Sequence, residues 1–134
     1  MGDGPTADDS PNATVREADP DDLLDVMRVL DAAMLEADAD AVRERIAAGE
    51  ALVAEADGAV VGALALDGSR VEAVAVRRTR RGRGIGSALV EAAAVRTGDL
   101  TAEFDPRVRP FYESLGFDVE PRSRRLRGRL RRER

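Results

Sequence analysis

A glycine-rich segment, RRTRRGRGIGSALV at residues 77–90, combines residue types suited to binding a phosphate group. It lies between an expected strand that ends at Val76 and an expected helix that begins near Gly84. The first turn of a helix presents unpaired backbone N–H groups and a partial positive charge, which together attract an anion. Glycines let a bulky phosphate approach the backbone closely. The arrangement therefore suits a pyrophosphate.

Two other interpretations of this segment fit its context less well. A dinucleotide-binding fingerprint requires G-x-G-x-x-G after the first strand of a parallel βαβ unit. The residues from Gly82 to Gly86 read G-x-G-x-G and follow an expected hairpin meander instead. A plain glycine turn with solvated arginines would explain G-x-G taken alone.

The residue types that are missing exclude several kinds of chemistry. Histidine and cysteine are absent, and all 21 basic residues are arginine. A zinc site, a Ser-His-Asp triad, a disulfide, a Walker-type P-loop and Schiff-base chemistry are therefore excluded, and no metal site is expected. Any general base must be a carboxylate, a backbone carbonyl or a water relayed by one of these.

Two motifs resemble those of one enzyme family. Arg81-x-x-Gly84-x-Gly86 is similar to the R/Q-x-x-G-x-G/A acyl-CoA signature of the GNAT acetyltransferases, and FYESLGF at residues 111–117 resembles their second motif. One expected helix and one expected strand separate the two motifs, as in that family. The resemblance covers roughly residues 13–130. It implies a GNAT fold, acetyl-CoA as acetyl donor, and direct transfer of the acetyl group to an amine of a small molecule, peptide or protein.

The resemblance also implies how acetyl-CoA would be bound. The pantetheine arm would pair with the backbone of a strand at Val74, Ala75 and Val76, where an N–H of Val74 or its neighbour would polarise the thioester carbonyl. Asp105 matches, by its spacing from Tyr112, a position that often contacts the cofactor. The pyrophosphate would lie on the backbone of the glycine-rich segment, at Arg81, Gly82, Arg83, Gly84, Ile85, Gly86 and Ser87.

Two residues are assigned catalytic roles. Tyr112 matches the general acid of the family, which protonates the departing CoA thiolate; a half-buried core tyrosine is the alternative. Glu72 stands two residues before Val74, where some family members place a general base. By two-residue alternation it should share a face with Arg70, Val74 and Val76. Glu103 on a neighbouring expected strand is the second candidate for the base, and an ordinary solvent-facing role remains open for Glu72.

The elements that would position these residues follow from periodicity and turn signals. Asp-Gly pairs separate three short apolar runs, which predicts an antiparallel meander. The expected order is β-α-α-β-β-β-α-β-α-β-β, an α/β fold with a mixed, mostly antiparallel central sheet flanked by helices. Residues 1–12 are expected to form a disordered acidic tail, and residues 13–134 a single domain. The expected strands are 13–17, 51–56, 59–66, 71–76, 100–104, 117–120 and 124–130, and the helices 23–34, 39–48, 84–98 and 107–115.

Charge is distributed unevenly along the chain. Residues 1–69 carry 17 acidic residues and 4 arginines, whereas residues 70–134 carry 9 acidic residues and 17 arginines. An acidic, lysine-free, alanine-rich composition is typical of halophilic, haloarchaeal-like proteins, although a GC-rich genome would produce a similar bias. No apolar run is long enough to span a membrane and no signal peptide is visible, so the protein is expected to be cytoplasmic with no membrane partner.

Two rival functions remain. The sequence argues against a nucleic-acid-binding role for the arginines of residues 77–83 and 122–134, because no aromatic residues are interleaved with them for base stacking. A catalytically silent acyl-CoA-binding module is not excluded by resemblance alone. The acceptor amine stays unidentified, since the acidic first two helices suit either a cationic amine or a salt-adapted surface. The resemblance also implies a possible homodimer through the last two strands.

Overall fold

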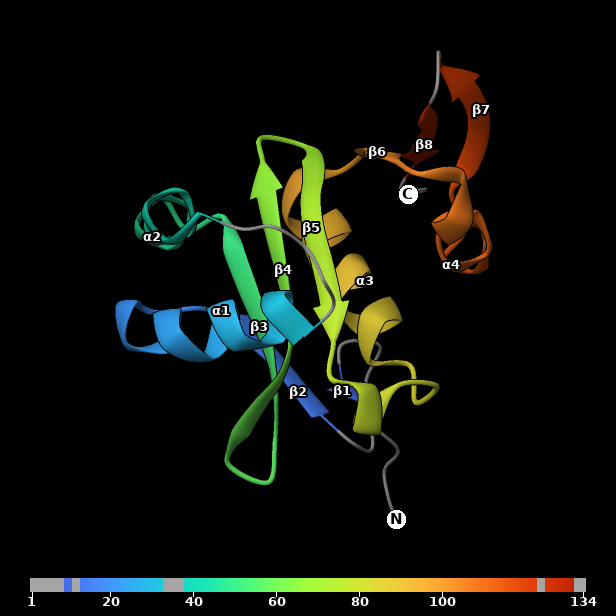
Figure 1. Ribbon diagram of the computed structural model, residues 1–134. Coiled ribbons are helices and arrows are strands. Elements are labelled where there is room, and N and C mark those ends of the chain that lie inside the picture. Colours follow the sequence, from blue (N-terminus) through green and yellow to red (C-terminus); the bar gives the residue numbers. More distant parts are fainter. Residues whose placement is uncertain (1–8, 11–12, 33–37, 123–124, 132–134) are drawn as a thin grey trace.

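The computed structural model describes residues 9–10, 13–32, 38–122 and 125–131. Within these residues, eight strands form one mixed sheet in the order β1-β2-β3-β4-β5-β6-β8-β7, with helices on both faces (Figure 1). None of the helices in this part of the chain is long and apolar enough to cross a membrane. The strands are β1 (Asp9–Ser10), β2 (Ala13–Glu17), β3 (Ala51–Ala56), β4 (Ala59–Asp67), β5 (Arg70–Val76), β6 (Leu100–Phe104), β7 (Asp118–Arg122) and β8 (Arg125–Leu130). The helices are α1 (Leu23–Ala32), α2 (Ala39–Ala47), α3 (Ile85–Thr97) and α4 (Arg109–Ser114), with 3-10 turns η1 (Pro20–Asp22), η2 (Arg78–Arg80) and η3 (Pro106–Val108).

The sheet is interrupted between β5 and β6. Strands β1 to β5 pair antiparallel in chain order, and β8 pairs antiparallel with both β6 and β7. In contrast, β5 and β6 run parallel and pair only at Arg70 with Thr101 and at Val71 with Ala102. Beyond Val71 the two strands separate, so the C-terminal strands stand off from the meander (Figure 1). The later part of β5 therefore has an edge that no described strand covers.

Each face of the sheet has its own hydrophobic core. On the α3/α4 face, the side chains of α3 and Tyr112 of α4 pack with Leu100, Ala102 and Phe104 of β6. On the α1/α2 face, the apolar side chains of both helices pack with Val53 of β3 and with other inward residues of β3 to β5. In α1 and α2, apolar residues recur every three or four positions and therefore lie on one side of each helix.

The sequence-based prediction of the elements is largely confirmed, with two local differences. Asp9 and Ser10, inside the expected tail, pair with β2, while residues 1–8 and 11–12 lie outside the described part. The helix expected over residues 107–115 is the turn η3 followed by the short helix α4, which has Pro110 in its first turn. The expected end of the first helix at Met34 also lies outside the described residues.

The expectation that Arg70, Glu72, Val74 and Val76 share a face is wrong. Ala65 of β4 lies opposite Ala73, but Leu66 lies opposite Val71, so Glu72 is an extra residue in a β-bulge. A bulge reverses the alternation of side chains beyond it. Val71 therefore shares the α3/α4 face with Val74 and Val76, whereas Ala73 and Ala75 pack on the α1/α2 face.

Candidate functional site

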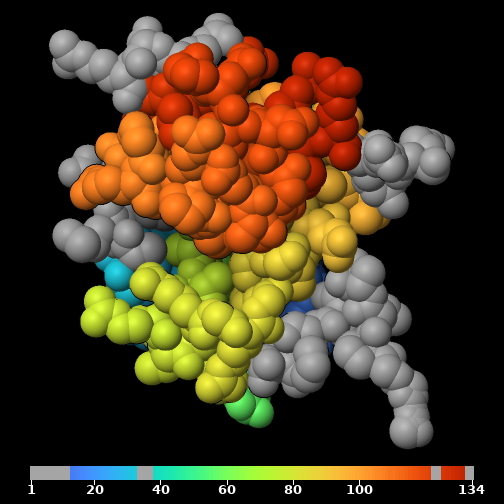
Figure 2. Space-filling model, turned by 90° about the vertical axis from the view of Figure 1, so that its right-hand side faces the viewer, coloured from blue at the N-terminus to red at the C-terminus, as the bar shows by residue number. Residues whose placement is uncertain are grey.

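A cavity of about 600 Å³ occupies the region where β5 and β6 separate. It is lined by residues 72–74 of β5, by Glu103 and Phe104 of β6, and by Tyr112 of α4 among others. Figure 2 shows the surface hollowed between the C-terminal segment, in orange, and the glycine-rich segment with the start of α3, in yellow. The cavity lies at the interruption of the sheet, and its lining includes residues from both faces of the sheet.

The glycine-rich segment forms an open turn at the start of α3. Gly82 and Gly84 have φ angles of 78° and 80°, a left-handed conformation that favours glycine. Gly84 is the N-cap of α3, and no side chain caps the helix. A Cβ atom built on either glycine would meet nothing within 4 Å. Open space at Gly82 and Gly84 therefore adjoins the first turn of α3, where backbone N–H groups lack partners within the helix, as an anion cradle requires.

Gly86 has a different environment from the other two glycines. It lies inside α3 and is buried, and a Cβ atom built on it would lie 3.3 Å from Cε1 of Phe111 and 3.7 Å from Cγ2 of Val76. The absence of a side chain at Gly86 thus permits close packing of Phe111 of α4 on α3. In this structure the space at Gly86 is filled by the protein itself.

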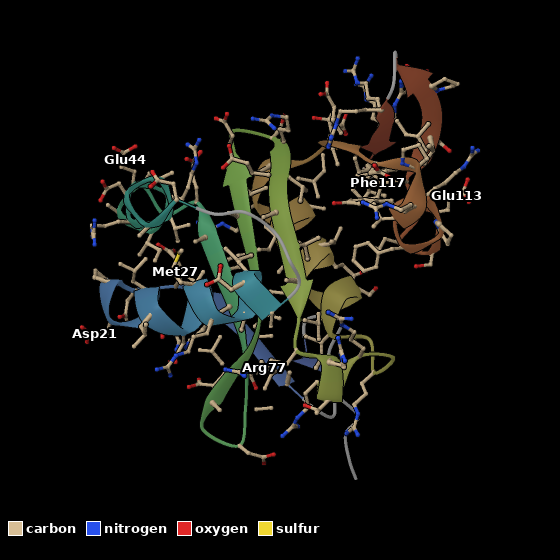
Figure 3. All side chains as sticks on the ribbon, in the orientation of Figure 1. Asp21, Met27, Glu44, Arg77, Glu113 and Phe117 are labelled. Atoms are coloured by element: carbon tan, nitrogen blue, oxygen red, sulfur yellow. The ribbon has the colours of Figure 1, made fainter. Side chains whose placement is uncertain are left out.

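The arginines that precede the glycines hold the turn in place. Arg77 Nε donates a hydrogen bond to the Val60 carbonyl at 2.9 Å (Figure 3). Arg81 Nε donates to the Val76 carbonyl at 3.0 Å, and Arg80 forms an ion pair with Asp57 at 3.1 Å. Arg83 is exposed. The side chains of Arg77, Arg80 and Arg81 thus make contacts within the fold. These contacts argue against a basic patch that is free to bind nucleic acid.

The open edge of β5 presents the backbone of Val74 and Val76. The N–H of Arg77 donates to the Val61 carbonyl of β4 at 2.8 Å. Alternate residues of an antiparallel strand direct their backbone groups to opposite edges, so the N–H and C=O groups of Val74 and Val76 point away from β4. The hydrogen bond from Arg81 to the Val76 carbonyl agrees with this direction. The N–H and C=O groups of Ala75 point toward β4 instead, where Ala75 lies opposite Ala63. Its side chain lies in the α1/α2 core.

Tyr112 lines the cavity from the α3/α4 face. Its side chain is buried, with 8% of the residue exposed. The ring stacks on Phe104 with 4.1 Å between centroids and meets Phe111 and Phe117 edge-on at 5.2 and 5.3 Å; Figure 3 labels Phe117 beside α4. Burial raises the pKa of the Tyr112 phenol, and the charge of Arg125 opposes this shift. The phenol is therefore protonated at neutral pH and able to donate a proton.

Glu72 lines the cavity at the opposite face, but its carboxylate is engaged. Arg45 of α2 donates to both of its oxygens, from Nε at 3.1 Å and from Nη2 at 3.3 Å. Arg70 Nη2 lies 3.5 Å from the same carboxylate. The Glu103 carboxylate also belongs to this face, because its neighbours Ala102 and Phe104 point to the other one. Glu103 has no hydrogen-bond or ion-pair partner for its carboxylate among the described residues.

Asp105, the predicted cofactor contact, lines the cavity and also caps the turn η3. Its Oδ1 accepts hydrogen bonds from the Arg107 backbone N–H at 2.9 Å and from Arg107 Nε at 3.2 Å. These two hydrogen bonds lower the pKa of the Asp105 carboxyl, and the charge of Arg125 adds to the effect. The carboxylate is thus a stabilising group at the entrance to α4 as well as a lining group of the cavity.

Sequence reasoning missed three residues that shape the site. Gly128 of β8 lies under the aromatic cluster, and a Cβ atom built on it would lie 2.9 Å from Phe104 and 3.0 Å from Phe117. Leu126, Gly128 and Leu130 alternate along β8, and this pattern could have indicated that position 128 faces the core. Arg45 and Arg125 carried no comparable signal, because their contacts depend on residues far away in the sequence. The described residues contain no cluster of acidic side chains placed to hold a metal ion.

Comparisons with known proteins are consistent with this geometry. The family model of the acetyltransferase (GNAT) domain matches residues 47–119, more than half of the chain. A GNAT-family acetyltransferase structure from Bacillus cereus is 16% identical, with a TM-score of 0.79 over 91% of this chain and 99% of that one. Ard1 from Thermoplasma volcanium is 20% identical, with a TM-score of 0.77 over 92% and 99%. YncA from Salmonella typhimurium, a putative acetyltransferase solved with its cofactor acetyl-CoA, is 22% identical, with a TM-score of 0.72 over 92% and 95%. A search of curated protein sequences found no match.

Proposed function

Because the chain belongs to the GNAT acetyltransferase family and is therefore an acyltransferase, we propose that it transfers the acetyl group of acetyl-CoA directly to an amine of a small molecule, peptide or protein. The separation of β5 from β6 is the observation that carries this proposal. Within the described part of the chain, it brings the edge of β5 that no strand covers, a buried phenol and a carboxylate without a partner to one cavity. A similar fold, that of YncA, was solved with acetyl-CoA, which supports the choice of donor.

The residues at the α3/α4 face fit acetyl-CoA as donor. The N–H groups from Ile85 to Ser87 receive the pyrophosphate, because Gly82 and Gly84 leave open space in front of them. The outward N–H and C=O groups of Val74 and the outward N–H of Val76 pair with the pantetheine arm as an added strand would. Arg81 supports this edge through its bond to the Val76 carbonyl. Arg83, next to these glycines, and Asp105, which lines the cavity, are further proposed contacts to the cofactor.

The transfer step requires one new bond, one broken bond and two proton movements. The amine nitrogen attacks the thioester carbonyl, a C–N bond forms, and the C–S bond breaks. The Val74 N–H stabilises the negative charge that develops on the carbonyl oxygen. The Tyr112 hydroxyl gives its proton to the departing thiolate, and a carboxylate at the α1/α2 face accepts the proton lost by the amine.

Glu103 is the better placed of the two candidate bases. A general base must approach the amine with a free lone pair, and the Glu72 carboxylate is held on both oxygens by Arg45. Glu103 lines the same cavity, and no described residue holds its carboxylate. We therefore expect Glu103→Gln to lower turnover more than Glu72→Gln does. A larger loss of turnover in Glu72→Gln than in Glu103→Gln would indicate that Glu72 is the general base.

A thiol-release assay with acetyl-CoA tests the proposal. The assay is run with amines, amino acids and N-terminal peptides, at low and at high salt because the composition favours a salt-adapted protein. Tyr112→Phe keeps the ring stacked on Phe104 and removes only the hydroxyl, so it should lower kcat while the Kd for acetyl-CoA stays within about twofold. Unchanged kcat would remove the acid role. Binding of acetyl-CoA without CoA release from any amine would favour a silent acyl-CoA-binding module.

A further inference from the structure

Some of the charged side chains that line the cavity have ion-pair partners and others do not, and this difference indicates which acceptor the cavity suits. Of the three carboxylates that line it, Glu72 is paired with Arg45 and Arg70, and Asp105 with Arg107. The third, Glu103, has no partner among the described residues. The described part of the cavity thus leaves one acidic group available to a ligand.

Arg125 is the available cation on the same side. Its neighbour Leu126 packs in the α3/α4 core, so Arg125 points to the α1/α2 face, as Glu103 does. Arg125 Nη2 donates to the Glu103 backbone carbonyl at 3.1 Å, which places the guanidinium beside Glu103. No carboxylate in the described part of the chain lies within ion-pair distance of it. A guanidinium has five N–H donors arranged to bind a carboxylate with two parallel hydrogen bonds.

From this arrangement we infer that the acceptor is a zwitterion such as an amino acid, whose amine faces Glu103 and whose carboxylate binds Arg125. The inference rests on the proposed acetyl transfer and names the class of its acceptor. The two groups lie side by side at the face opposite to the glycine-rich turn. Glu103, Arg125 and Val74 line the same cavity, so an amine bound at Glu103 shares that cavity with the edge of β5.

The test compares amino acids with their amides, which keep the amine and lose the carboxylate. The panel is the common α-amino acids and their amides, assayed by CoA release from acetyl-CoA. At least one acid should be acetylated with a kcat/KM about tenfold or more above that of its amide, the size expected for one charge-assisted contact. Arg125→Gln should raise KM for that acid about tenfold or more, leave KM for the amide within about twofold, and leave KM for acetyl-CoA unchanged.

Arg127→Gln is the matched control. Arg127 lies opposite Glu103 on the same face of β8 but does not line the cavity, so this variant should retain the preference for the acid. Equal activity toward acids and amides, an equal loss in both variants, or a raised KM for acetyl-CoA in Arg125→Gln would overturn the inference while leaving acetyl transfer intact. Absence of CoA release with every amine, including polyamines and peptides, would instead contradict the proposed function itself.

Discussion

A Cβ atom built on Gly86 would lie 3.3 Å from Cε1 of Phe111, so the start of α3 and the start of α4 are in close contact. Gly86 belongs to the glycine-rich segment and Phe111 to the FYESLGF motif. Tyr112 follows Phe111 directly and packs edge-on against it at 5.2 Å. The contact at Gly86 therefore positions the phenol relative to the proposed pyrophosphate cradle.

A larger residue at position 86 should disturb this relationship. Gly86→Val forces Phe111 outward, and we expect a loss of about 1–3 kcal/mol in the free energy of unfolding, as for overpacked sites, together with lower kcat. Phe111 is 37% exposed and has room to move. The double variant Gly86→Val with Phe111→Ala should therefore recover part of the stability in urea unfolding. Strictly additive losses would show that the two residues are not coupled.

An acidic side chain at the helix start should abolish binding of acetyl-CoA. Gly84→Asp places a negative charge in the space left for the pyrophosphate and a side chain on a residue with φ of 80°. Gly58→Asp is the control, because Gly58 has φ of 79° and equally open surroundings in the β3–β4 turn. Calorimetry should detect no binding to the first variant and normal binding to the second. Normal affinity in Gly84→Asp would refute the cradle.

Titration of Tyr112 can be followed directly, because it is the single tyrosine of a chain without tryptophan. Burial raises the pKa of its phenol above the ordinary value of 10.0. Since the protonated form is favoured in the folded state, its contribution to stability is present below that value and is lost as pH rises through the higher pKa of the folded state. The absorbance of tyrosinate should therefore appear at a higher pH in the native protein than in the protein unfolded in urea. Arg125→Gln should delay it further, because Arg125 opposes the shift; an earlier titration in this variant would contradict the placement of the guanidinium.

Asp22 should make the stability sensitive to acid. Arg16 donates to both oxygens of its carboxylate at 2.8 and 3.1 Å, and this pair lowers the pKa of Asp22 against the opposing effect of burial. The stabilisation is present above the unfolded value of about 4 and is lost as pH falls through the lower pKa of the folded state. Asp22→Asn should lower the free energy of unfolding by about 1–3 kcal/mol near pH 7. It should also reduce the dependence of this free energy on pH below about 4. Asp21→Asn, at an exposed neighbouring position, should change neither.

The order of the elements and the family could both be predicted from the amino-acid sequence. Hydrophobic periodicity, Asp-Gly turns and the proline and acids at the start of the first helix are local signals, because each depends on residues a few positions apart. The two motifs were recognisable for the same reason. They correctly indicated a GNAT fold, while the roles of Tyr112 and Glu72 remain predictions for the assays described above.

The contacts that these residues make depend on the tertiary structure and could not be predicted from the sequence. The bulge at Glu72 depends on the register between β4 and β5, which no local pattern specifies, and it moves Glu72 onto the face where Arg45 holds it. The close approach of Phe111 to Gly86, and of Phe104 to Gly128, likewise joins segments distant in the sequence. Such contacts arise when whole elements pack, so their geometry is a property of the folded sheet rather than of any segment.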